Sequence, residues 1–331
     1  MEYSDQLRFI AEAITFADAH LIVRGPKGEE SHRDLPGDMT GGHVVDTLSS
    51  LIYETLYCGN YTLHSTRGGN HVTDAPVTAG HVTAVATESG WTAKEILGSG
   101  FVLAEKPPVS KWFSPGRYAV VAYSRADSGK NSELVAIHQR QWKDPDAEVL
   151  YYASKDSWSY DWYPQARFYF NTRSDATIRV FDQLKALAEV RRIPMRIKCC
   201  PMRSGFHRTD NVVCYVNRTL IDYAFDAIAG VAADVRPCLR ADVPLFTHRI
   251  SDGWSFAEDP GAGESFGSNR CRHVAEGIWL SWSQGLYGSE AILGSLIGYF
   301  HTSGISLTHP YLVGHLDGFP RYEYRCLREV I

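Results

Sequence analysis

The stretch 193-IPMRIKCC-200 decides the fold, because it has the composition of a β-strand yet carries two cationic side chains. Its β-branched and apolar residues favour an extended backbone, and prolines stand at or beside both of its ends. Alternation along a strand separates an apolar set from a charged pair: Met195, Ile197 and Cys199 against Arg196 and Lys198. The apolar face predicts a sheet that covers a hydrophobic core. The charged face is either solvated or chemically active.

Two more segments divide in the same way when they are read with a period of two. In 166-ARFYFNT-172 the phenylalanines face one way, and the polar set faces the other: Arg167, Tyr169 and Asn171. In 211-NVVCYVN-217 an apolar set opposes a mixed one: Val212, Cys214 and Val216 against Val213, Tyr215 and Asn217. If the three strands share a sheet, one face packs on helices and the other displays arginine, lysine, tyrosine and asparagine.

Helical periodicity accounts for much of the remaining chain. It predicts helices over 7–20, 44–57, 175–191, 220–235, 272–283 and 289–302, the last with a serine N-cap and a stop at Gly304. Two further strands, 100-GFVLAEK-106 and 116-GRYAVVAYS-124, are expected on either side of a turn at Pro107 and Pro108. Residues 251–270 are rich in glycine and turn-forming residues, which predicts a loop.

These elements predict an α+β fold class. We expect a mixed or antiparallel sheet with helices on one face and a polar active-site face, plus a helix-rich N-terminal part. Residues 1–145 are expected to form a helical and β-hairpin region suited to peptide or partner binding. Residues 146–331 are expected to form the catalytic region, unless the two parts make one continuous domain.

Composition excludes several classes of protein. The chain has 331 residues, 44% hydrophobic and 21% charged, with 33 basic and 38 acidic residues and a net charge of -5. An acidic balance argues against a general binder of nucleic acid or of membrane surfaces, which would usually be basic. The sequence has no uninterrupted apolar run of about 18 residues, as a membrane span requires, and no signal peptide is expected. Seven cysteines without CxxC spacing favour a reduced, cytoplasmic compartment.

Positive charge is concentrated in one part of this acidic chain. Residues 191–218 contain seven arginines and lysines but only one acid, Asp210, a local balance of +6. Arginine forks match phosphate oxygens, so this concentration suits a phosphate site. A solvated sheet face would also carry such residues. Tyr169 and Tyr215 favour the first interpretation, because phenols on a polar face suggest that something covers it.

Other motifs are weaker. The run 263-GESFG-267 matches the G-x-S-x-G elbow of serine hydrolases, but the segment before it is expected to be a loop, so a hydrolase is kept only as an alternative. A metal site could be drawn from His71, Asp74 and His81, but nothing in the sequence fixes their geometry. His273 is expected to be an ordinary helix-face residue. The sequence has no HExxH, P-loop or dinucleotide-type GxGxxG motif.

A series of segments in the second half resembles the HopA-type effector family. They are RFYFN, IPMRIK, RTDNVVCYVNR, PLFT, AEDPGAGESFGSNRCRHVAEG and HPYL, in that order, over residues 167–312. The block AEDP, ESFG and RC is the specific part, and the preceding SPGRYAVVAYS fits more loosely. The family includes bacterial type III effectors and lyases of thioamitide and class V lanthipeptide pathways, and it is thought to be related to phosphothreonine lyases.

The resemblance implies a lyase that removes phosphate by β-elimination from a phosphorylated precursor peptide, giving dehydroalanine or dehydrobutyrine. Lys198 falls on the base lysine of the related phosphothreonine lyases, and neighbouring arginines would lower its pKa by like-charge repulsion. Tyr169 stands where phosphothreonine lyases have an acidic histidine, so it is the candidate proton donor or a hydrogen bond to phosphate. The implied phosphate-binding residues are Arg167, Arg208 and Arg270. The implied substrate-positioning residues are Asn171 and Tyr215.

The same resemblance implies no metal or organic cofactor and a separate kinase as partner. One alternative is a non-catalytic protein that binds a phosphopeptide or a host protein with the same arginines. The serine hydrolase is the other.

Overall fold

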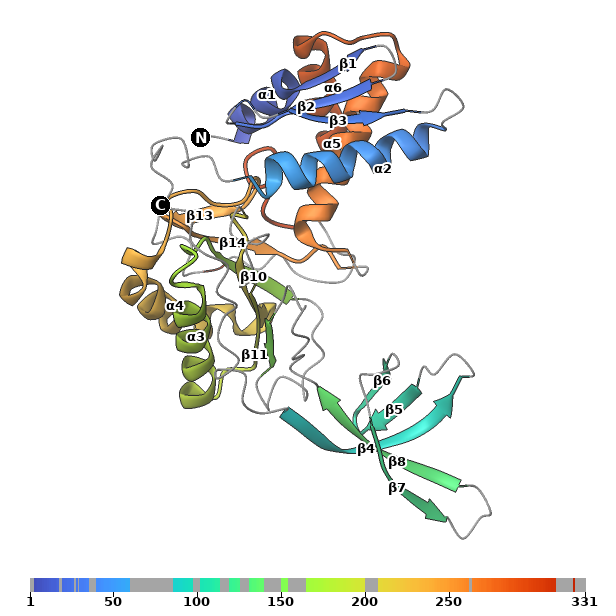
Figure 1. Cartoon of the computed structure of the whole chain (residues 1–331), viewed down its shortest axis with the longest axis vertical. Helices are drawn as coiled ribbons and strands as arrows, with labels where there is room; N and C mark the ends of the chain where they lie inside the picture. The colour runs from blue at the N-terminus through green and yellow to red at the C-terminus, as the bar shows by residue number, and fades with distance from the viewer. Residues whose placement is uncertain are drawn as a thin grey trace.

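The computed structural model describes residues 3–17, 20–26, 28, 30–35, 40–59, 86–97, 102–113, 119–125, 131–139, 150–153, 165–199, 208–261, 264–313 and 324. They form helices and three antiparallel sheets of three, six and five strands (Figure 1). The predicted α+β class is confirmed. None of the described helices is long and apolar enough to cross a membrane.

The six-stranded sheet forms the centre of the molecule. Its order is β13 (His248–Ser251), β14 (Trp254–Glu258), β10 (Gln165–Phe170), β12 (Val212–Asn217), β11 (Met195–Cys199) and β9 (Leu150–Ala153). Each of these strands runs antiparallel to its neighbours. The three strands whose faces alternate in the sequence, β10, β12 and β11, lie side by side, as predicted.

Helices cover the apolar face of this sheet, because each alternating strand turns its hydrophobic side chains the same way. Phe168, Cys214 and Ile197 are fully buried on that face. Helices α3 (Thr177–Arg191) and α4 (Ile221–Asp234) lie against it (Figure 1). The ring of Phe168 lies 6.2 Å from that of Phe225 on α4. The opposite, polar face is therefore the one left for a site.

A second layer joins both ends of the chain. It contains α1 (Tyr3–Ala13), α2 (Gly41–Ile52), the π-helical turn η1 (Tyr53–Tyr57), α5 (Phe266–Ser283) and α6 (Ser289–Thr302). Helix α1 packs on α6 and α2 packs on α5 (Figure 1). A small sheet of β1 (Ile14–Ala17), β2 (His20–Arg24) and β3 (Glu30–Asp34) belongs to the same layer.

The N-terminal helices share one hydrophobic core with the later part of the chain. The buried cluster includes Leu7 and Leu48 together with Phe266 and Phe300. The side chain of Gln6 accepts a hydrogen bond of 2.7 Å from the backbone N–H of Phe246. The proposed boundary near residue 145 stays a prediction.

The five-stranded sheet lies at the other end of the molecule from these helices (Figure 1). Its order is β6 (Val109–Phe113), β5 (Val102–Lys106), β4 (Ala86–Ile96), β8 (Asn131–Gln139) and β7 (Ala119–Arg125). The turn at Pro107 and Pro108 joins β5 to β6 and not to the strand that begins at Ala119. The prediction therefore missed β6, which intervenes in the sequence.

Two other boundaries were wrong. The first helix ends at Ala13, and Ile14–Ala17 pairs with β2 as a strand, in keeping with its β-branched and aromatic residues. The expected loop over 251–270 contains β14 and the start of α5. All five residues of β14 are buried, so its two faces do not alternate in polarity and the periodic signal of a strand is lost.

Helix α6 begins at Ser289 as predicted, but its N-cap is Gly288 and no side chain caps it. Gly304 has a positive φ of 71° just beyond the helix, which is the left-handed stop expected of glycine. His71, Asp74 and His81 lie outside the described residues. Within the described part of the chain no group of three metal-ligating side chains comes together.

Candidate functional site

A cavity of about 320 Å³ opens on the polar face of the six-stranded sheet. Its walls come from the sheet, from η1, from the segment before β12 and from the loop between β14 and α5. The lining residues are Gln165, Arg167, Tyr169, Lys198, Val213 and Tyr215 of the sheet, with Tyr53, Tyr57, Arg208, Asp210, Asp259, Gly261, Glu264, Ser265 and Gly267.

The strand register explains how the sheet residues meet. Val213 on β12 is the direct partner of Tyr169 on β10 and of Lys198 on β11. Tyr215, two residues along, is the direct partner of Arg167. Directly paired residues of adjacent strands point to the same face. The predicted common face of Arg167, Tyr169, Lys198 and Tyr215 is confirmed, and all four line the cavity.

Arg167 is held from one side by an aspartate. Its Nε donates to Asp259 Oδ2 at 2.8 Å, and Nη2 donates to the same oxygen. Gln165 Nε2 also donates to that oxygen at 2.8 Å, and the guanidinium lies 5.1 Å from the ring of Tyr215. Burial acts to lower the pKa of Arg167, but Tyr169, Tyr215 and Asp259 outweigh it and raise that pKa. Its Nη1 makes no hydrogen bond with a described residue, so it is available to a ligand.

Arg208 is held in the same manner by its own neighbours. Its Nε and Nη2 donate to the two carboxylate oxygens of Asp210, each at 2.8 Å, and Nη2 donates to the Tyr53 hydroxyl at 2.9 Å. Burial opposes its charge, but Asp210 raises the pKa of Arg208 above the ordinary value. Here too Nη1 makes no hydrogen bond with a described residue.

These pairings change the charge expected at the site. The local excess of +6 does not gather in the cavity, because Lys198 and Arg208 are the only described cations of that run that line it, and Arg208 is paired with Asp210. The third cation of the lining, Arg167, is paired with Asp259. Elsewhere in the same run, Arg218 is buried against Glu258 at 2.6 Å. Among the lining residues, only Lys198 is a cation for which the described residues provide no ion pair.

Two tyrosines lie deep in the cavity wall. Tyr57 and Tyr169 are 1% and 2% exposed, and their hydroxyls lie beside each other, but neither makes a well-formed hydrogen bond with a described residue. Burial raises the pKa of Tyr169 to about 12, although Arg167 opposes that shift. Burial and the nearby Tyr169 raise the pKa of Tyr57 well above its ordinary value. Both phenols therefore stay protonated near neutral pH and can donate.

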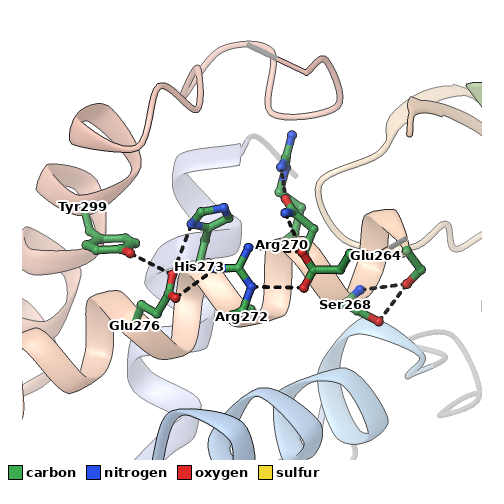
Figure 2. A network of polar contacts seen from close by, with 9 residues as sticks. Glu264, Ser268, Arg270, Arg272, His273, Glu276 and Tyr299 are labelled. Carbon is green, nitrogen blue, oxygen red and sulfur yellow. Dashed lines mark hydrogen bonds and ion pairs between the residues drawn. The ribbon is translucent and has the colours of Figure 1, made fainter. Parts of the chain in front are cut away.

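A polar network runs from the cavity along α5 to α6 (Figure 2). Arg272 donates to both carboxylate oxygens of Glu264 at 3.0 and 3.1 Å and to Glu276 at 2.9 Å. The hydroxyl of Tyr299 on α6 donates to Glu276 at 2.7 Å. This network fixes the carboxylate of Glu264, which lines the cavity, and the guanidinium of Arg272 neutralises its charge.

Ser265 caps α5. Its Oγ accepts from the backbone N–H of Ser268 at 3.1 Å and lies 2.7 Å from the Ser268 hydroxyl. The expectation that no strand precedes the GESFG motif was wrong, because β14 does. However, no histidine is among the described residues that line the cavity. The arrangement is that of a helix N-cap, and it lacks the histidine base of a hydrolase triad.

Two predicted residues lie outside the cavity lining. Arg270 is 3% exposed and donates to the carbonyl oxygens of Pro310 at 2.8 Å and Leu312 at 2.9 Å, and its third nitrogen donates to Asn269. Burial lowers the pKa of Arg270 to about 10. The geometry therefore does not bring Arg270 together with Arg208 on one anion, because its donors hold the segment after α6.

Asn171 is the other. Strand β10 ends at Phe170, so the period-two phase no longer applies to Asn171. Its side-chain amide donates to the carbonyl oxygen of Asp242 at 2.9 Å, and its backbone carbonyl accepts from Arg240 at 2.8 Å. Asn171 fixes the end of the strand to the 239–242 segment, away from the cavity.

Sequence reasoning missed the residues that complete the walls. Tyr53 and Tyr57 stand four residues apart in the second predicted helix, so their common face was readable, but nothing in the sequence connects that face to residue 167 or 198. Asp259 lies within the specific AEDP block and Asp210 two residues after Arg208. Their roles depend on contacts that become visible only in the fold.

One family model matches more than half of the chain. Residues 135–312 match the profile of the HopA1 effector protein family. The structure of the effector protein from Pseudomonas syringae pv. tomato strain DC3000 is 17% identical, with a TM-score of 0.39. That from Pseudomonas syringae pv. syringae strain 61 is 12% identical, with a TM-score of 0.37. Each match covers 52% of this chain and 66% of the other. No curated protein matches the chain.

Proposed function

The chain belongs to the HopA1 effector protein family, and from that premise we propose that it is a phosphoserine or phosphothreonine lyase. The reaction would be β-elimination of phosphate from a phosphorylated precursor peptide, leaving dehydroalanine or dehydrobutyrine. The observation that carries the proposal is that Lys198, Tyr169, Arg167 and Arg208, from three separate segments of the chain, line one cavity. An amine, a phenol and two guanidinium groups are the groups that such an elimination needs.

Lys198 is the proposed base. Its amine, in the neutral form, takes the proton from the Cα of the phosphorylated residue. The electron pair of that C–H bond forms the Cα–Cβ double bond, and the bond from Cβ to the phosphate oxygen breaks. Lys198 suits this step because the described lining residues give it no carboxylate partner that would hold its proton.

Arg167 and Arg208 are the proposed phosphate ligands. Asp259 and Asp210 orient the two guanidinium groups while Nη1 of each stays available. Negative charge grows on the phosphate as the Cβ–O bond breaks, so fixed cationic donors stabilise the transition state more than the ground state.

Tyr169 is the proposed donor to the leaving phosphate. Its raised pKa keeps the phenol protonated near neutral pH, so it hydrogen-bonds to the leaving oxygen or gives it a proton. Tyr215, stacked against Arg167, would position that guanidinium. The separate kinase and the cytoplasmic location remain parts of the proposal.

The test is direct. Purified protein is incubated with synthetic peptides that carry one phosphoserine or phosphothreonine, and with the same peptides unphosphorylated, and the products are identified by mass spectrometry. We expect loss of phosphoric acid and a dehydrated residue that reacts with added thiol. Release of phosphate with serine left behind would identify a phosphatase. Tight binding of the phosphopeptide without turnover would identify a binding protein that uses the same arginines.

A further inference from the structure

We propose that Tyr57, from the N-terminal part of the chain, is a second phenol ligand of the anion, acting together with Tyr169. This inference rests on the proposed function for its substrate, a phosphorylated residue. It adds a site residue that lies outside the stretch matched by the family. Tyr57 lines the cavity and is 1% exposed, and its hydroxyl lies beside that of Tyr169 without making a well-formed hydrogen bond to a described residue. A buried polar group in that condition needs an explanation, and a ligand oxygen supplies one.

The ring of Tyr57 is held firmly in place. It stacks on Tyr53 at 5.3 Å, with the two planes 12° apart. Gly267 lies against both rings, and an added Cβ there would stand only 2.6 Å from Tyr57 Cζ. A fixed ring presents its hydroxyl without losing side-chain entropy when the ligand binds.

The backbone at Tyr57 is fixed as well. Thr209 donates its hydroxyl to the Tyr57 carbonyl oxygen and its N–H to the Cys58 carbonyl oxygen, each at 3.1 Å. Tyr57 ends the π-helical turn η1, and such turns occur frequently at functional sites. These contacts join Tyr57 directly to the segment that carries Arg208.

The charge balance of the cavity explains why neutral donors would be used. Asp259 and Asp210 compensate Arg167 and Arg208, so the cavity offers an anion less net positive charge than the sequence suggests. Phenol hydroxyls add hydrogen bonds without adding charge. Because burial and Tyr169 raise the pKa of Tyr57, this hydroxyl stays a donor near neutral pH.

The experiment compares Tyr57→Phe with Tyr324→Phe. Tyr324 is also buried, at 5% exposed, but it is not among the residues that line the cavity. Its hydroxyl donates to Glu258 at 2.5 Å and accepts from Arg218 at 3.1 Å. Binding of inorganic phosphate is measured by titration calorimetry, thermal stability by calorimetric scan, and elimination with the phosphopeptides described above.

Tyr57→Phe is expected to bind phosphate about 10-fold or more weakly, with an unchanged or higher Tm, because it removes a hydroxyl that no described residue satisfies. Tyr324→Phe is expected to show the reverse, a lower Tm and unchanged phosphate affinity. Wild-type affinity in Tyr57→Phe overturns the inference, and so does a wild-type protein that binds no phosphate. If Tyr57→Phe loses affinity while the wild type eliminates nothing, Tyr57 is an anion ligand and only the lyase proposal fails.

Discussion

Tyr169 and Lys198 lie two strands apart in one transverse row of the sheet, with Val213 directly between them. Adjacent strands are about 4.8 Å apart, so the two backbones are separated by about 10 Å. The two side chains can then approach a bound residue from opposite sides. In the proposed elimination, Lys198 would take the Cα proton and Tyr169 would donate to the leaving oxygen. Their positions in this row suit these two roles.

Replacing Lys198 tests the base. Lys198→Arg keeps a positive charge but cannot become neutral at any working pH. We expect it to retain most phosphopeptide affinity and to lose at least about 100-fold in elimination rate. Lys198→Ala should lose elimination and bind somewhat less well. Lys94→Arg, on the five-stranded sheet and paired with Glu105, is the matched control. A wild-type rate of dehydroalanine formation in Lys198→Arg would show that Lys198 is not the base.

Arg208, which lines the cavity, and Arg270, which is buried outside its lining, should behave differently. Arg208→Ala should weaken binding of a phosphopeptide more than binding of the same peptide without phosphate, as measured by calorimetry. Arg270→Ala should instead destabilise the fold, because it leaves two carbonyl oxygens without a donor, at about 1–3 kcal/mol each. Its folded fraction should bind phosphate normally. Selective loss of phosphopeptide affinity in Arg270→Ala would show that Arg270 does bind the phosphate.

Ser265 should prove to be a helix cap. Ser265→Ala removes the acceptor of the Ser268 N–H and is expected to lower the free energy of unfolding by about 1 kcal/mol. Elimination should persist at least in part. Ser265→Asp, another good cap, should restore most of the lost stability. Covalent labelling of Ser265 by an organophosphonate would support the hydrolase alternative.

Gly267 has no room for a side chain. In Gly267→Ala the new Cβ would stand 2.8 Å from Tyr53 Cε2 and closer to the Tyr57 ring, so both rings of the cavity wall must shift. We expect lower stability and weaker phosphate binding. Gly294→Ala is the control, because nothing lies within 4 Å of its Cβ and it is also helical. That change should leave binding intact and raise stability by roughly 0.5–1 kcal/mol. Equal behaviour of the two variants would contradict the crowding at Gly267.

His273 gives the fold a pH dependence. Burial, and then the charge of Arg272, lower the pKa of His273, and Glu276 opposes them only in part. Below about pH 6.5 the unfolded chain binds a proton that the folded chain resists, so stability falls as the pH falls. His273→Gln should flatten this decline, as measured by urea unfolding at pH 7.5 and pH 5.5. An unchanged slope would show that other groups dominate.

The sequence predicted best what depends on local periodicity. Alternation in β10, β11 and β12 was sufficient to place Lys198 and Tyr169 on one face, because that face repeats every second residue. It failed at Asn171, where the strand had already ended, and at β14, where burial on both faces removes alternation. Arg270 was misplaced because a cation near a glycine-rich run looks like an anion ligand until its carbonyl partners are known.

What periodicity cannot show is which distant groups compensate a charge. Asp259 accepts a hydrogen bond from Arg167, which lies 92 positions earlier in the sequence. The neutral hydroxyl of Tyr53 accepts one from Arg208, which lies 155 positions later. Within the basic run 191–218, Glu258 from another segment neutralises Arg218, so that charge is lost to the site as well. Pairings of this kind depend on three-dimensional contacts, and no regular spacing in the sequence predicts them.

The attachment of Thr209 to Tyr57 and Cys58 couples ligand binding to the packing of the N-terminal helices on the rest of the chain. A ligand that touches both Tyr57 and Arg208 binds only molecules in which the N-terminal helices are docked on the sheet. A free ligand concentration of 100 times Kd would therefore stabilise the docked state by about 2.7 kcal/mol. Amide hydrogen exchange in α2, far along the helix from any ligand atom, should then slow when phosphate is added, so the N-terminal helices would report on occupancy of the cavity.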